Sequence, residues 1–283
     1  MILYRKAVLV RSRQINLRPI GDLQMGEKGF RKDLWERWKR EALEDSTSLI
    51  LGMGDYSDRF RTSIDIKLRQ TLVTDMSAFS EFDYLCMKEM QDLAEELKPF
   101  KHRILGLHCG HHHHVMASNV CTCQYLCQLL GVKHLGWLAM TQLIIRRHKN
   151  RLHPEGHIVD IFSTHGCGGS SQISGDLAKV ERTILPFWDA DLFIRGHSTK
   201  VFSVPGHPLN RLSRNTRTDI KLMKKSRLIV NTGGFLDGYT EGHVSYVEQS
   251  NLPPCALGYS VINFHIPDGG NENVRINANS VTE

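Results

Sequence analysis

The segment Ser48–Asp55, SLILGMGD, is the stretch of sequence from which the fold can be predicted. It is a short apolar run that ends in Gly-Asp, which is typical of a buried strand followed by a tight turn. Four other segments have the same form, since each is apolar and ends at a side chain that can bind a metal. They are INLRPIGD (15–22), HRILGLHCGHH (102–112), HIVDIFSTH (157–165) and DLFIRGH (191–197).

Amphipathic segments separate several of these runs. Helices are predicted at 30–45, at 81–97 before Pro99, at 119–130 before Gly131 and at 173–185. Alternating helices and apolar strands indicate an α/β fold. After residue 200 the sequence favours β-structure. Residues 1–270 are predicted to form one domain, followed by a polar tail at 271–283 in which we expect partial disorder.

The composition excludes several classes of protein. Hydrophobic residues make up 41% of the 283 residues, but no run approaches the roughly 18 apolar residues that a membrane helix requires. The N-terminal segment contains scattered Arg and Lys and does not resemble a signal peptide. Seven cysteines, an odd number, do not suggest a secreted disulfide framework. We therefore expect a soluble, cytoplasmic protein without a membrane partner, and its net charge of +6 suits an anionic substrate.

Potential metal ligands lie at the five strand ends. They are Asp22, Asp55, the adjacent pair His111 and His112, His165 and His197. The carboxyl ends of strands line one crevice in open α/β proteins, so side chains from distant segments can meet there. Carboxylates together with imidazoles suit a divalent ion such as Mn, Fe, Zn or Ni. The sequence therefore predicts a metal site at this edge.

The order of these motifs resembles the calcineurin-like metallophosphoesterase superfamily. The motifs are GDLQ (21–24), GMGDYSD (52–58), GHH (110–112), STHGCGG (163–169) and RGHS (195–198). In that family the pattern is GD-x-H, GD, GNH, a lone His and GH-x-H. The later segment NTGGFLDGYTEG (231–242) is similar to the C-terminal parts of phage and bacterial members, so GHH in place of GNH suggests a branch of that type.

The resemblance implies a two-sheet β-sandwich flanked by helices, with two metal ions that share an aspartate. Asp55 would be the shared ligand, and Asp22 would bind the first metal. His165 and His197 would bind the second metal. His112 corresponds to the family's catalytic histidine, which contacts the phosphoryl oxygen and protonates the leaving group.

Three positions depart from the family pattern. Gln24 replaces a histidine on the first metal, where its amide oxygen would be a weaker ligand. Thr199 replaces the second histidine of GH-x-H. His111 replaces the asparagine on the second metal, which is a change to a better nitrogen ligand. The second metal site therefore looks complete, whereas the first lacks nitrogen ligands.

The predicted function is metal-dependent phosphoester hydrolysis with one or two divalent ions. Manganese is favoured, and iron, zinc, nickel and magnesium remain alternatives. The basic stretch 211–227, if it overhangs the crevice, would favour a polyanionic substrate such as nucleic acid, and hence a phosphodiester over a monoester. The alternative is a catalytically inactive phosphoesterase scaffold that binds protein or nucleic acid, as decay at Gln24 and Thr199 would suggest.

Several other residues admit simpler interpretations. The histidines at 113 and 114 are expected to support the site or face solvent. Those at 207 and 243 are expected to be loop histidines, with replacement of the missing ligands of the first metal as the alternative. Asp58 is expected to cap a helix or to support a site residue, and the structural role is favoured. The C-x-C-x3-C spacing of Cys121, Cys123 and Cys127 does not match a zinc knuckle, so reduced thiols at a helix are expected there.

Overall fold

A computed structural model shows a mixed α/β fold built on a large mixed sheet. The structure describes residues 1–58, 76–146, 156–212, 219–268 and 273–283. Its strands are β1 (Ile2–Leu9), β2 (Gln14–Ile20), β3 (Ser48–Gly52), β4 (Ile104–His108), β5 (His134–Gly136), β6 (Leu138–Arg146), β7 (His157–Thr164), β8 (Leu192–Arg195), β9 (Val201–Leu212), β10 (Leu222–Gly234), β11 (Gly258–His265) and β12 (Arg275–Thr282). Its helices are α1 (Lys32–Glu44), α3 (Met76–Leu97), the 3-10 helix η1 (Lys98–Arg103), α4 (Thr122–Leu130), α5 (Ile173–Thr183) and α6 (Tyr246–Gln249).

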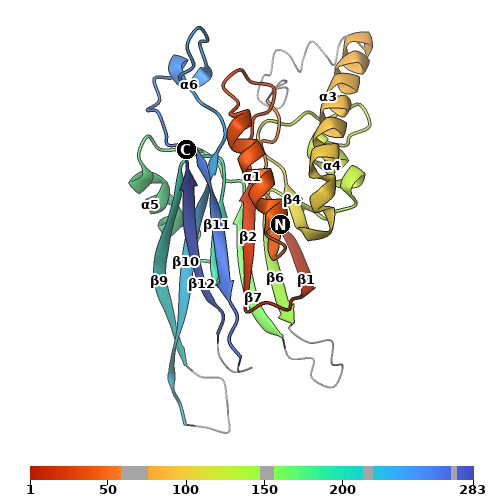
Figure 1. Ribbon diagram of the computed structural model, residues 1–283. Helices are drawn as coiled ribbons and strands as arrows, with labels where there is room; N and C mark the ends of the chain where they lie inside the picture. Colours follow the sequence, from red (N-terminus) through yellow and green to blue (C-terminus); the bar gives the residue numbers. More distant parts are fainter. Residues whose placement is uncertain (59–75, 147–155, 213–218, 269–272) are drawn as a thin grey trace.

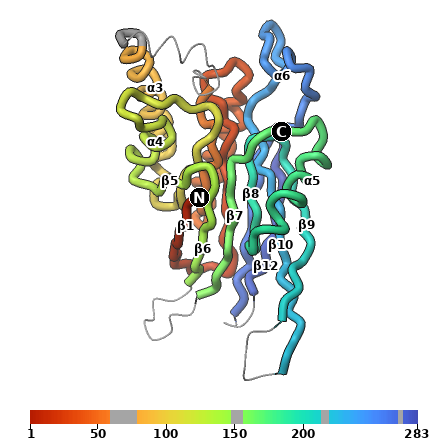
Figure 2. Tube along the Cα trace, turned by 180° about the vertical axis from the view of Figure 1, so that it is seen from behind, coloured from red at the N-terminus to blue at the C-terminus, as the bar shows by residue number. Residues whose placement is uncertain are grey.

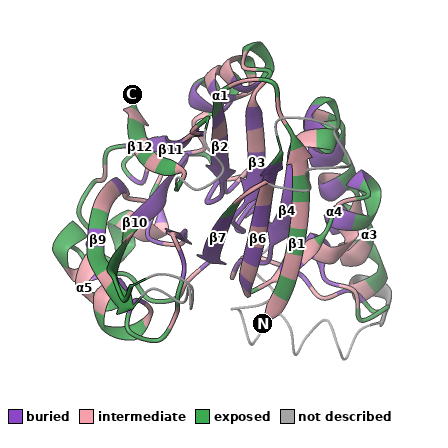
Figure 3. Cartoon of the chain, turned by 90° about the horizontal axis from the view of Figure 1, so that it is seen from below, coloured by how far each residue is buried: buried purple, intermediate pink, exposed green. Residues whose placement is uncertain are grey.

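Strand β10 joins two halves of the sheet. In the described chain the strand order is β1-β6-β7-β8-β10-β11-β2-β3-β4-β5, with β9 beside β10 and β12 beside β11 (Figure 1). Most of β10 pairs with β8 and β9, while Gly233 and Gly234 at its end pair with β11. Side chains of the two halves share one apolar cluster, in which Leu51 and Leu105 lie with Leu143 and Ile161. Figure 3 shows the buried residues on the strands of both halves.

The helices cover the outer faces of the two halves. Trp38 of α1, Leu97 of α3 and Leu126 of α4 are fully buried in a cluster with residues of β2, β3 and β4. Figure 2 shows α5 on the other half, beside β8, β9 and β10. Val180 of α5 packs there with Phe193 and with other residues of β7 to β10. Strands β3 and β4 are therefore covered on both faces, which explains why their sequences are apolar throughout.

Parallel pairing brings the predicted strand ends together. Strands β2, β3, β4 and β5 are parallel neighbours, and β7, β8 and β10 are parallel in the other half. Because parallel strands end at the same edge of a sheet, the segments that follow β2, β3, β4, β7 and β8 gather at one end of the molecule.

The described residues of the basic stretch, 211–212 and 219–227, do not overhang that end, so the condition on which a polyanionic substrate was favoured is not met by them. In β10, Asn231 lies opposite Arg195 of β8, close to His197, whereas Leu228 already lies opposite the first residue of β8. The preceding basic residues of β10 therefore extend away from the site (Figure 1). At about 3.3 Å per residue, the start of β10 is on the order of 30 Å from it. Arg214 and Arg217 lie outside the described residues.

The polar tail at 271–283 contains a strand. Residues Arg275–Thr282 form β12, which pairs antiparallel with β11 along its whole length. The partial disorder expected there is wrong for this strand, because backbone hydrogen bonds to β11 order it and Ile276 and Ala278 pack against an apolar cluster. Among the described helices, none combines the length and apolar character needed to span a membrane.

Candidate metal centre

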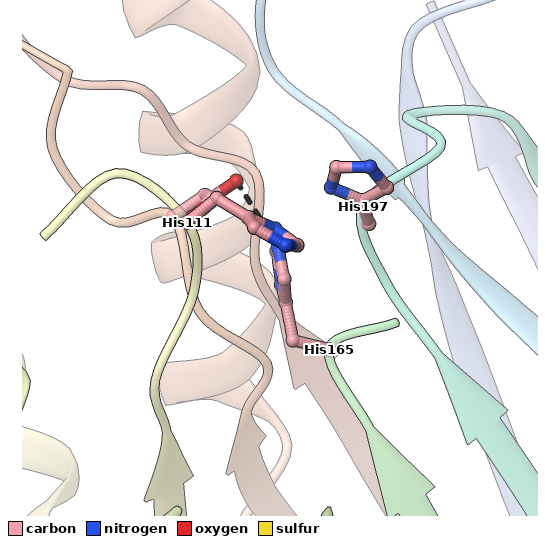
Figure 4. Close-up of side chains that lie close together, drawn as sticks. His111, His165 and His197 are labelled. Carbon is pink, nitrogen blue, oxygen red and sulfur yellow. Dashed lines mark ion pairs between the residues drawn. The ribbon is translucent and has the colours of Figure 1, made fainter. Parts of the chain in front are cut away.

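Five turns, each following a strand, form the candidate site. Asp22 follows β2, Asp55 follows β3, His111 follows β4, His165 follows β7 and His197 follows β8. Figure 4 shows the three imidazoles directed toward one another from three different segments. Both carboxylates and His165 are buried. The structure thus brings together side chains that are up to 175 positions apart in the sequence.

Four of these residues have the spacing of a metal-ligand set. One ligand atom from each of Asp55, His111, His165 and His197 lies within 4.8 Å of all the others. Nε2 of His165 is 3.1 Å from Oδ2 of Asp55, and the ring centroids of His111 and His197 are 4.5 Å apart. Three imidazole nitrogens and one carboxylate oxygen could bind one divalent ion of the transition series.

Hydrogen bonds fix one oxygen of each carboxylate. The backbone N–H of His197 donates to Oδ2 of Asp22 at 2.9 Å, and that of His112 donates to Oδ1 of Asp55 at 2.9 Å. Within the part of the chain that the structure describes, Asp22 Oδ1, Gln24 Oε1 and His197 Nδ1 are buried and have no hydrogen-bond partner. Buried polar atoms without partners are costly, so these orphaned atoms fit a bound cation.

His165 is held in the orientation that a ligand requires. Its Nδ1 donates to the carbonyl oxygen of Met53 at 2.7 Å, which leaves Nε2 directed toward Asp55. A hydrogen bond of this kind fixes the tautomer and the ring orientation of metal-binding histidines. The site therefore presents Nε2 of His165 as a ligand atom.

Burial and neighbouring charges shift the pKa values of the buried carboxylates and imidazoles of the site. Burial raises the pKa of Asp22 to about 7, although His165 partly offsets this effect. Burial would lower the pKa of His165, but the hydrogen bond and the charge of Asp55 raise it to about 9. Burial and the neighbouring His165 lower the pKa of His197 to about 4. A divalent cation would favour ionised carboxylates and neutral imidazoles, which is the combination that these ligands need.

Five residues in these turns have left-handed backbone conformations. The φ angles are 51° at Asp22, 52° at Gln24, 50° at Asp55, 73° at His197 and 56° at Thr199. Non-glycine residues in this region cost of order 1–3 kcal/mol each and persist where the surrounding structure imposes them. Their concentration at these strand ends is consistent with a site whose ligand geometry is fixed in advance.

His112 lies at the edge of the metal-ligand set and contacts a second aspartate. Its Nδ1 is 2.5 Å from Oδ1 of Asp58, and its Nε2 is 4.0 Å from Oδ2 of Asp55. Asp58 therefore orients His112, which agrees with the supporting role that the sequence left open beside that of a helix cap. Its position three residues after Asp55, in GMGDYSD, was the signal for this role.

The ligand set of a first metal is less complete. Asp22 is buried near Asp55, and Gln24 is buried with its backbone N–H bonded to the carbonyl of Asp55 at 3.1 Å. The Thr199 hydroxyl donates to the carbonyl of Ser198, and its side chain lies against Gly234. Asp22 and Gln24 are thus the described side chains that could bind this first metal beside the ion held by Asp55, His111, His165 and His197.

The remaining histidines have other contacts. Nε2 of His114 is 2.5 Å from Asp83, and Nδ1 of His113 is 2.8 Å from the carbonyl oxygen of Gly110. His207 is exposed on β9 and His243 lies 3.7 Å from Glu27. A buried His108 bonds to Gly136 and Ser163, so it belongs to the core.

Trp137 is a site residue that the sequence did not reveal. Its ring centroid lies 5.1 Å from that of His111 and 5.7 Å from that of His113, and its side chain is 45% exposed. It follows β5 directly, in an apolar stretch where a lone tryptophan is more typical of a core. Because the ring is exposed beside His111, it provides an aromatic surface at the edge of the site.

Gly110 allows the histidine loop to approach Asp55. A Cβ atom at Gly110 would lie 2.0 Å from Oδ1 of Asp55, so Gly110→Ala must displace His111 and His112. We expect the hydrolysis proposed below to fall by about a hundred-fold, since a displacement of about 1 Å can cost that much. Gly169→Ala is the matched control, because its Cβ would meet nothing within 4 Å. The metal content and the activity of both variants are measured beside those of the parent. If Gly110→Ala were as active as Gly169→Ala, the role given to Gly110 would be contradicted.

Comparisons with known proteins do not assign a family. No protein-family model matches the chain, and no curated protein matches it. Among solved structures, Vps29 from Chaetomium thermophilum has a TM-score of 0.36 and 11% identity, covering 96% of this chain and 97% of that chain. A conserved uncharacterized protein from Streptococcus pneumoniae TIGR4, described as a predicted phosphoesterase, has a TM-score of 0.33 and 12% identity, covering 95% of this chain and 98% of that chain.

Proposed function

We propose that this chain is a calcineurin-like metallophosphoesterase that hydrolyses phosphoesters with one or two divalent ions. The observation that carries the proposal is the convergence of Asp55, His111, His165 and His197 within 4.8 Å. The motif order along the chain supports the same superfamily, with a single domain at 1–270 and the two halves of the sheet arranged as a sandwich.

The residues divide into metal ligands and a proton donor. Asp55, His111, His165 and His197 would hold one ion, and Asp22 and Gln24 would contribute to a second. Such an ion supplies Lewis-acid stabilisation of the phosphoryl oxygens and lowers the pKa of water.

His112 would protonate the leaving oxygen. Nδ1 of His112 lies 2.5 Å from Oδ1 of Asp58 and forms an ion pair with it when His112 is protonated, so the other proton of the ring would be on Nε2, the atom nearer to the metal ligands. A positioned acid of this kind contributes about 10²- to 10⁴-fold to the rate. Asp58 also keeps the ring in one orientation, which a proton donor requires.

The preferred substrate remains a phosphodiester, but with less support than the sequence suggested. The basic part of β10 is directed away from the site, so it does not argue for nucleic acid at the metal centre. The exposed ring of Trp137 beside His111 offers an apolar surface for an organic substituent of the phosphate.

Metal-stripped protein titrated with Mn²⁺ tests the proposal. We expect hydrolysis of bis-p-nitrophenyl phosphate to appear with Mn²⁺ and to disappear with chelator, and p-nitrophenyl phosphate compares the monoester. Zn²⁺, Ni²⁺, Fe²⁺ and Mg²⁺ are tested in the same way. Absence of turnover on both esters with every ion would favour the alternative, a scaffold that binds partners without catalysis.

A further inference from the structure

A second group of metal-binding side chains lies outside the site described above. Cys109 directly follows β4, Cys121 is the N-cap of α4, Cys123 lies in the first turn of α4, and His134 is the first residue of β5. The fold brings them together because β5 pairs with β4, so that His134 lies beside Leu107, two residues before Cys109.

The ligand atoms of Cys109, Cys121 and His134 have a spacing that approaches that of a tetrahedral zinc site. Sγ of Cys109 lies 3.5 Å from Sγ of Cys121 and 3.1 Å from Nε2 of His134, and the ligand atoms of these three residues all lie within 4.8 Å of one another. The buried thiol of Cys123 is a neighbour of Cys109 and Cys121 but lies outside this three-residue group, so it would have to move toward an ion to become the fourth ligand. With Zn–S bonds of about 2.3 Å, sulfur ligands in a tetrahedron lie roughly 3.8 Å apart.

The surroundings separate this cluster from solvent. Cys109, Cys121 and Cys123 are 4%, 8% and 3% exposed and belong to an apolar cluster with residues of α1, α3 and α4. All three are free thiols in the structure. The backbone N–H of Gln124, at the start of α4, donates to Sγ of Cys121. A helix N-terminus of this kind stabilises thiolate, which is the form that binds a metal.

We propose that Cys109, Cys121, Cys123 and His134 bind a structural Zn²⁺ ion. Three thiolates and one imidazole are a ligand set of closed structural zinc sites, which leave no open position for a substrate. The C-x-C-x3-C spacing alone suggested reduced thiols, because Cys109 and His134 are distant in the sequence. The proposed ligands are Cys109 and His134 together with Cys121 and Cys123. Cys127, the third cysteine of the spacing, is buried further along α4 and is not a proposed ligand.

This ion would bind residues at both ends of the loop between Cys109 and Cys121, which carries His111 and His112. Cys109 precedes that loop and Cys121 ends it. The backbone of Cys109 also packs against Gly54, the residue before Asp55, since a Cβ at Gly54 would lie 2.7 Å from the Cys109 carbonyl oxygen. The zinc would therefore fix the position of the loop without taking part in any reaction.

Metal analysis and Co²⁺ substitution test the proposal on the full chain. Protein from zinc-supplemented cells is expected to keep one zinc per chain after desalting, and Asp55→Asn is expected to keep it too. The Co²⁺-substituted protein should show the sulfur-to-cobalt charge-transfer band of thiolate ligation. Cys123→Ser should weaken this band and lose the retained zinc, whereas Cys86→Ala, a buried cysteine of α3 outside the cluster, should change neither.

His134→Ala keeps the test decisive if Cys123→Ser does not fold, because His134 is only partly buried. This variant should lose the retained zinc while its far-ultraviolet circular dichroism stays that of the parent. Absence of a thiolate band, or a band unchanged in both variants, would overturn the proposal. So would an intact mass two hydrogens lighter, with Cys109 and Cys121 resistant to alkylation, since that result means a disulfide. Loss of hydrolysis in Asp55→Asn with its zinc retained separates this proposal from the proposed function.

Discussion

Asp55→Asn is expected to abolish metal-dependent hydrolysis, with kcat/KM falling by about a thousand-fold or more. Asp55 is the carboxylate in the four-residue ligand set, and its Oδ2 lies 3.1 Å from His165. Asparagine keeps the shape and still accepts the hydrogen bond from the backbone of His112, but it has no charge for a cation. Loss of an outer partner of a metal ligand already costs about 10- to 100-fold in affinity, so loss of this ligand should cost at least as much.

The measurement is Mn²⁺-dependent hydrolysis of bis-p-nitrophenyl phosphate, with Mn²⁺ affinity determined on the same samples. Asp33→Asn is the control, because Asp33 is exposed on α1 and pairs with Arg31. It should keep the activity and affinity of the parent. Parent-level activity in Asp55→Asn would contradict the role assigned to this aspartate and would remove the main support for the proposed site.

Local sequence predicted much of the fold because the relevant signals lie within single segments. The apolar run of β3 ends in a turn at Gly-Asp, and α4 begins with a capping box at Cys121 and Gln124 and ends at Gly131, which has a φ of 66°. Such signals depend on neighbouring residues, so they can be identified in one sequence. The recurrence of potential ligands at strand ends then predicted which side chains meet.

The features that the sequence did not predict depend on how strands distant in the sequence pair with one another. The direction of the basic residues in β10 depends on its register with β8, which no local pattern specifies. The same limit applies to Cys109 and His134, which join the other two cysteines only because β4 pairs with β5. Strand β12 forms through its pairing with β11, and its few apolar side chains, Ile276, Ala278 and Val281, are too sparse among polar residues to predict a strand.

Gln24 and Thr199, which replace the two histidines expected on the first metal, differ in what they can offer to an ion. Gln24 remains buried with its amide oxygen available, so it keeps a weak ligand near Asp22. Thr199 uses its hydroxyl on the carbonyl of Ser198 and therefore offers no strong ligand. A chain with one strong and one weak site should bind two ions with clearly different affinities. Hydrolysis that saturates when only the tighter site is filled would assign the chemistry to Asp55, His111, His165 and His197.

His112→Gln is expected to lower kcat by about a hundred-fold on esters with poor leaving groups, while Mn²⁺ affinity stays within a few-fold of the parent. Nε2 of His112 lies beyond the ligand set, 4.0 Å from Asp55, and Nδ1 is held by Asp58. A proton donor matters most when the leaving oxygen is basic, so p-nitrophenyl esters should lose less activity than phenyl or alkyl esters. Asp58→Asn should show the same leaving-group pattern with a smaller loss, because it orients the ring without donating a proton itself.

The leaving-group series separates proton donation from a structural role. A variant that merely distorts the loop would lower the rate on all esters by a similar factor and would weaken metal binding. His207→Gln is the control, since its side chain is 84% exposed on β9, and it should behave as the parent on every ester. If His112→Gln lowered the rates on p-nitrophenyl and alkyl esters equally, His112 would have to act on the phosphoryl oxygen and not on the leaving group. If it changed neither rate, the proton would have to come from another residue of the site or from water.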